Sequence, residues 1–173
     1  MRTKLLSAIA VSALLSFPVL AKSHHGSANR VSGTDQAFLE KAAQGNMFEI
    51  QMGKMAQRSS NPMVKQFADR MVTDHTDLLN QVKTVASAQG VTLPTTVNAS
   101  QQATMDRLSK LSGAEFDRDY INTMVKDHKE DINEFHHEAT TGTVPAVKTL
   151  AQNALPKLHE HLTLAENAQK TVG

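Results

Sequence analysis

The sequence of 173 residues predicts an all-α fold built from four long helices and one short helix. Apolar residues in each long segment recur with a period near 3.6, and no window alternates apolar and polar residues for long enough to indicate a strand. Proline, glycine and capping residues stand where these periodic segments begin and end.

The first two helices form one predicted pair. Thr34 is positioned to cap a first helix that runs to about Ser59. Asn61 followed by Pro62 is typical of a helix start, with the asparagine as N-cap and the proline in the first turn. Gly90 ends this second helix.

The second half of the chain repeats this pattern. A stretch around Pro94 leads to a short helix over about 100–111. The segment Ser112–Glu115 reads as a capping box that starts a third long helix, which Gly142 ends. A fourth helix follows over 145–169.

The connections between these helices predict the topology. Only a few residues join the first helix to the second and the third to the fourth, which requires antiparallel hairpins, whereas more than twenty join the second to the third. One long crossover containing a short extra helix indicates a ferritin-like four-helix bundle over residues 34–170, and a simple up-down bundle is the alternative.

The N-terminal residues predict export. Arg2 and Lys4 precede an apolar run over 5–19, and Ala21 is the small residue that signal peptidase favours. We therefore expect a signal peptide over 1–21, cleaved near Ala21, a flexible segment over 22–33, and a mature chain in the periplasm or secreted.

Charge and cysteine content restrict the function. Removing Arg2 and Lys4 from the 18 basic residues leaves 16 against 17 acidic residues, so we expect no nucleic-acid partner. No second hydrophobic stretch predicts a transmembrane segment in the mature chain, and zero cysteines exclude disulfides and thiolate metal sites. Protein partners and homo-oligomerisation are left open.

A repeated pentapeptide marks the candidate site. M-V-x-D-H occurs at 71–75 and at 124–128, each time with an aromatic residue eight positions before the histidine. In a helix the aromatic residue, the methionine and the histidine fall at i, i+4 and i+8. His75 and His128 are therefore expected on helix faces that point into the core.

The other two long helices each add one polar residue on the inward face. These are Glu49 and His161, and the helical rise places both at about the level of His75 and His128. One carboxylate and three imidazoles suit Zn²⁺, Fe²⁺ or Cu²⁺, so we predict a single transition-metal ion here. Asp74 and Asp127 are expected to accept the second ring N–H of a histidine on a neighbouring helix.

The predicted mature N-terminus is a second metal candidate. A chain that begins Lys22-Ser23-His24 offers an α-amine, two amide nitrogens and an imidazole, which together suit square-planar Cu²⁺ or Ni²⁺. His24 is the side-chain ligand of this predicted site, and a solvated tail is the alternative.

The sequence favours a non-enzymatic role. A di-iron bundle needs Glu-x-x-His in two helices, whereas Val72, Val125 and Leu158 stand three residues before the histidines. The hypothesis is an exported helical domain that binds a transition metal and is linked to envelope stress. The alternative is a structural or interaction module with a buried His/Glu layer and no metal.

Several segments together resemble the exported bacterial domain-of-unknown-function 4142 family over nearly all of the mature chain. The resemblance implies a ferritin-like four-helix bundle in the cell envelope and implies no activity. The segments that carry it are N-M-F-E-I at 46–50, N-P-M-V-K-Q-F-A-D-R-M-V-T-D-H at 61–75, S-G-A-E-F-D-R-D-Y at 112–120, M-V-K-D-H at 124–128 and A-L-P-K-L-H-E-H-L at 154–162.

Overall fold

A computed structural model describes residues 31–173 of the chain. Over this range the all-α prediction is confirmed, and no strand is present there. Along these described helices, no stretch combines the length and the apolar character that a membrane crossing requires. The helices are α1 (Gly33–Ala56), α2 (Pro62–Ala88), α3 (Ala99–Leu108), α4 (Gly113–Thr141) and α5 (Pro145–Val172).

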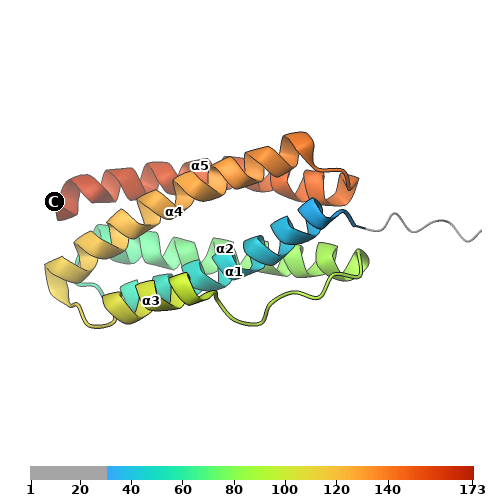
Figure 1. The fold of residues 1–173 in the computed structure, drawn as a ribbon. Coiled ribbons are helices and arrows are strands. Elements are labelled where there is room, and N and C mark those ends of the chain that lie inside the picture. The colour runs from blue at the N-terminus through green and yellow to red at the C-terminus, as the bar shows by residue number, and fades with distance from the viewer. Residues whose placement is uncertain (1–30) are drawn as a thin grey trace, which may run out of the picture.

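The predicted signal peptide, residues 22–30 of the predicted flexible segment, and the His24 site lie outside the described residues. The helices themselves form two antiparallel hairpins, α1 with α2 and α4 with α5 (Figure 1). After α2 the chain runs back along the bundle through α3, so that α4 starts at the end where α2 starts. The long crossover is therefore confirmed, and the up-down alternative is wrong.

Two of the predicted N-caps differ in the structure. The first helix begins earlier than expected because Ser32, not Thr34, caps it, and the Ser32 hydroxyl accepts a hydrogen bond from the Asp35 N–H. Ser112 makes no capping bond with its side chain. The next residue is Gly113 with φ of 57°, a left-handed conformation that suits glycine. The Asn61 cap is confirmed.

The bundle contains two apolar cores. A layer of buried polar residues separates them near the middle of α1, α2, α4 and α5. Gly53 lets α1 approach α2 next to this layer, because a Cβ atom there would lie 2.9 Å from Val72 Cγ2 and 3.1 Å from the Ala68 carbonyl oxygen. The polar layer consists of Asn46, Glu49, His75, His128 and His161.

At one end of the bundle, α1 caps α5. Val144 precedes α5 and has no capping side chain of its own. The buried Asp35 carboxylate on α1 instead accepts hydrogen bonds from the Thr143 N–H at 2.9 Å, the Thr143 hydroxyl at 2.5 Å and the Val144 N–H at 3.4 Å. The contact joins residues 108 positions apart and ties the two hairpins together.

Glu138 lies buried beside this cap and provides a test by pH. Burial, and then the neighbouring Asp35 carboxylate, raise the pKa of Glu138 from 4.5 to about 7. Because the pKa is raised in the folded protein, the contribution of Glu138 to the free energy of unfolding is present below pH 4.5 and is lost as pH rises through 7. We expect the free energy of unfolding to fall by about 1 kcal/mol between pH 6 and 8 from this group. Urea unfolding should show a smaller fall in the free energy of unfolding between pH 6 and 8 for Glu138→Gln than for the wild type. An equal fall in both proteins would contradict the assignment of this pH dependence to Glu138.

Candidate metal centre

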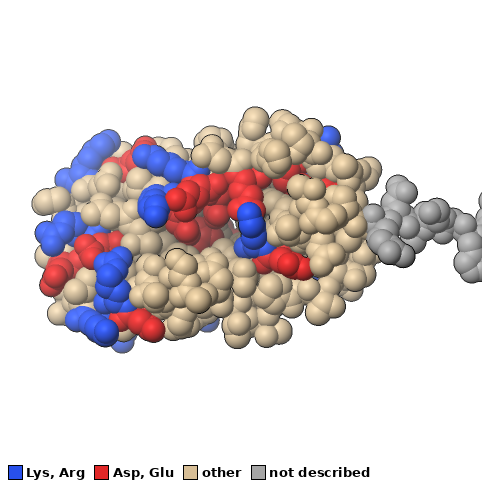
Figure 2. Space-filling model, viewed as in Figure 1, with Lys and Arg blue, Asp and Glu red and all other residues tan. Residues whose placement is uncertain are grey.

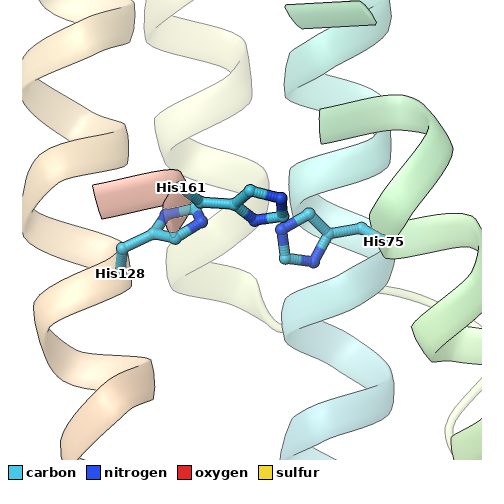
Figure 3. A group of neighbouring side chains, drawn as sticks. All are labelled: His75, His128 and His161. Atoms are coloured by element: carbon cyan, nitrogen blue, oxygen red, sulfur yellow. The ribbon is translucent and has the colours of Figure 1, made fainter. Parts of the chain in front are cut away.

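Three histidines from three helices point toward one another in the polar layer (Figure 3). Their ring centroids are 5.1 to 5.5 Å apart, and one ring nitrogen from each lies within 4.8 Å of the other two. His75 on α2, His128 on α4 and His161 on α5 are each at most 1% exposed. Two successive helical hairpins are therefore needed to assemble this group.

One nitrogen of each ring is held by a hydrogen-bond acceptor. His128 Nδ1 lies 3.0 Å from the Met124 carbonyl oxygen one turn earlier on α4, so this nitrogen carries the proton and donates it. In the same way His161 Nε2 donates to Asp74 Oδ2 at 2.9 Å. His75 Nδ1 faces Asn46 Oδ1 at 3.0 Å.

The opposite nitrogens have no partner. His75 Nε2, His128 Nε2 and His161 Nδ1 are buried, and none of them forms a hydrogen bond with any residue in the range 31–173. With the proton on the anchored nitrogen, each of these atoms carries a lone pair. Metal-binding histidines have this arrangement, in which an acceptor holds one nitrogen and the other is free to coordinate.

The imidazoles are neutral at pH 7. Burial lowers the pKa of His75 to about 3 and, together with the nearby His75, lowers that of His161 to about 4. Burial also lowers the pKa of His128 well below 6.5. Because the unfolded histidines take up protons first, this stabilisation is lost as pH falls from about 6.5 toward 4. Neutral imidazoles are the form that binds metals.

The Glu49 carboxylate lies beside the anchored nitrogens of two histidines and not beside their free nitrogens, where a fourth metal ligand would lie. Its Oε2 lies 2.7 Å from His75 Nδ1, and its Oε1 lies 3.4 Å from His128 Nδ1. These are the anchored nitrogens, so the carboxylate lies behind the two rings and not among their free lone pairs. Burial raises the pKa of Glu49 well above 4.5.

The two aspartates next to the repeated histidines have different surroundings. Asp74 receives the His161 N–H, and Arg70 at 2.6 Å and Lys157 at 3.5 Å hold the same oxygen. Asp127 makes no contact within 4 Å with a histidine in the described range. It lies instead near Glu49, on the side of the layer where α1 faces α4.

Sequence reasoning missed two residues of this layer. Asn46 lies one turn before Glu49 on α1, is 2% exposed, and contacts His75. Asp131 lies one turn after Asp127, and its carboxylate comes within 4.8 Å of those of Glu49 and Asp127. The spacing of three or four residues from a predicted site residue was the available signal in both cases.

A surface pocket leads to two of the histidines. His75 and His161 help to line a pocket of about 270 Å³ between α2 and α5. Asp74 and Lys157, which form an ion pair, also line this pocket. Two of the three rings therefore border a surface pocket, while their free nitrogens stay buried.

Comparison with known proteins places the chain in a family. Residues 20–168 match the family described as Domain of unknown function (DUF4142). No curated protein matches the sequence.

Solved structures share the fold at low identity. A DUF305 fragment from Deinococcus radiodurans is 14% identical with a TM-score of 0.72, over 82% of this chain and 98% of that one. CopM in its Cu(I)-bound form is 19% identical with a TM-score of 0.67, over 81% and 98%. CopM in its Cu(II)-bound form is 17% identical with a TM-score of 0.64, over 79% and 96%. These similarities establish a shared helical-bundle fold.

Proposed function

We propose that this chain, which belongs to the DUF4142 family, binds one transition-metal ion in its core through His75 Nε2, His128 Nε2 and His161 Nδ1. The observation that carries the proposal is the set of three buried lone pairs without partners. A layer that served only to set helix register would satisfy its polar groups internally, since an unpaired buried polar atom costs about 1–3 kcal/mol. This layer leaves three such atoms, on rings that each bring one nitrogen within 4.8 Å of the other two.

Copper and zinc fit the donor set best. Neutral imidazoles suit both ions, and three histidines with one open position is an established zinc geometry. Fe²⁺ is less favoured, because its usual sites combine histidines with a carboxylate ligand, and Glu49 lies behind the rings. Copper gains support from the shared fold with copper-bound CopM and from the soft sulfurs of Met52, Met71 and Met124, which are buried in the adjoining core.

Glu49 acts in this proposal as a partner of the ligands. Its Oε2 lies 2.7 Å from His75 Nδ1 and its Oε1 lies 3.4 Å from His128 Nδ1, and a carboxylate beside these two nitrogens strengthens the opposite nitrogens as metal ligands. Its negative charge also offsets that of the ion. On this basis we expect Glu49→Gln to retain metal with an affinity lower by about 10- to 100-fold.

The same proposal places the protein in the periplasm, with a role in metal handling during envelope stress. Its support is the predicted cleavage near Ala21, together with the separate His24 site that this cleavage would create.

Metal titration of protein recovered from the periplasm tests the function, and N-terminal sequencing of the same sample tests the cleavage. To remove the His24 site, all samples carry His24→Ala and His25→Ala. We expect about one tightly bound Cu or Zn per chain by elemental analysis, and a loss of affinity of at least about 100-fold in His128→Ala.

An exposed histidine on the helix that carries His161 provides the matched control. His159→Ala removes an imidazole from the surface and should retain full binding. Failure of the protein with only the two N-terminal substitutions to take up either ion, or equal binding by the His128 and His159 variants, would rule out the core site.

A further inference from the structure

A second group of ligand atoms lies beside the histidines. One carboxylate oxygen from each of Glu49, Asp127 and Asp131 lies within 4.8 Å of the other two. Asp127 and Asp131 are one helical turn apart on the face of α4 turned toward α1, and Glu49 extends from α1 between them and the histidine layer. The two aspartates are partly buried.

The Glu49 carboxylate points into this group without a hydrogen-bond donor. It is fully buried, and neither of its oxygens accepts a hydrogen bond by geometry from the part of the chain that the structure describes. Asp127 Oδ2 is also buried there without a partner. Burial of a carboxylate without a donor is costly unless a proton or a cation neutralises it.

The protein supplies little positive charge here. No lysine or arginine in the described range lies within 4 Å of the three carboxylates. Two lysines on the same helices pair with other acids, Lys41 with Glu134 at 3.3 Å and Lys126 with Glu130 at 3.8 Å. Burial, and then the surrounding carboxylates, raise the pKa of Asp131 well above 3.8.

An acidic hollow lies on the same side of the bundle, between α1 and α4. Figure 2 shows acidic side chains gathered in a hollow at the middle of the face formed by α1 and α4. Glu130, Glu134 and Glu138 line a pocket of about 560 Å³ between these helices. Gly45 leaves space beside Asp131, since even a Cβ atom there would lie 3.9 Å from Asp131 Oδ1.

We propose that Glu49, Asp127 and Asp131 form a second cation site, distinct from the histidine centre, that binds a hard divalent ion of the Mn²⁺ class with water completing the coordination. Carboxylate oxygens suit Mg²⁺, Ca²⁺ and Mn²⁺, whereas the three imidazoles suit copper or zinc. Glu49 lies between the two sites, because its Oε2 is 2.7 Å from His75 Nδ1. The bundle then holds two ions of different chemistry side by side.

Mn²⁺ titration followed by electron paramagnetic resonance tests this site. The signal of free Mn²⁺ should disappear up to about one equivalent in wild-type protein. Asp131→Asn keeps the shape of the side chain but removes its charge, and we expect it to weaken Mn²⁺ binding at least tenfold while copper or zinc binding persists. His161→Ala should show the reverse pattern, so failure of one site is distinguishable from failure of the other.

Glu115→Gln is the control, since Glu115 is an exposed acid in the first turn of the same helix. It should bind Mn²⁺ like the wild type. No Mn²⁺ binding by wild-type protein, or equal binding by Asp131→Asn, Asp127→Asn and wild type, would overturn the proposal and show that protons neutralise the group.

Discussion

Saturation with copper or zinc is expected to raise the free energy of unfolding by about 4 kcal/mol when free metal is a thousandfold above Kd. The ion binds the folded chain through His75, His128 and His161, which come from three helices and are far apart in the unfolded chain. For a domain of this size the melting temperature should rise by about 10 °C. Thermal unfolding with chelator and with added metal measures the difference.

The metal-dependent difference is the informative quantity, because loss of a buried histidine also affects the metal-free protein. His161→Ala should show almost no gain on adding metal, whereas His159→Ala, at an exposed position two residues earlier, should show the full gain. Equal gains in both variants would mean that the stabilising ion binds elsewhere.

Asp35→Ala is expected to destabilise the bundle by about 3 kcal/mol, the second large effect. The substitution removes the acceptor of the Thr143 and Val144 N–H groups at the start of α5, where Val144 is buried. Burial alone raises the pKa of Asp35, but hydrogen bonds from Ser32 and Thr143 outweigh it and keep the carboxylate ionised. Its charge is therefore present at the N-terminus of α5.

Chemical denaturation of Asp35→Ala, Asp35→Asn and Asp77→Ala separates these effects. Asp35→Asn retains an acceptor but loses the charge, so its loss of stability should be smaller than that of Asp35→Ala. Asp77 is exposed on α2, and its removal should change stability by less than about 0.5 kcal/mol. An Asp35→Ala protein as stable as Asp77→Ala would contradict the bridging role.

Much of the fold could be predicted because helix boundaries depend on local chemistry. Asn61 with Pro62, and Gly142, mark ends that the structure retains within a residue or two. The crossover followed from connection lengths, since a few residues force a hairpin and more than twenty do not. Capping was less predictable: Ser32 replaced Thr34 because several nearby residues can cap a helix, and the packed chain selects among them.

The sequence alone also determined that four polar residues face the interior. A period of 3.6 places Glu49, His75, His128 and His161 on inward faces, and the rise per residue places them at one level. Only the tertiary structure decided which atoms meet. It set Glu49 behind the anchored ring nitrogens, paired His161 with Asp74, and brought Asp131 to Glu49 and Asp127.

The physical reason is that periodicity fixes the direction of a side chain only to within a broad sector around its own helix. The rotation of each helix about its axis, the distance to its neighbour and the side-chain rotamers are set by packing against the other helices. Asp35 shows the same limit, since its partners Thr143 and Val144 are more than a hundred residues away and become neighbours only when the two hairpins dock.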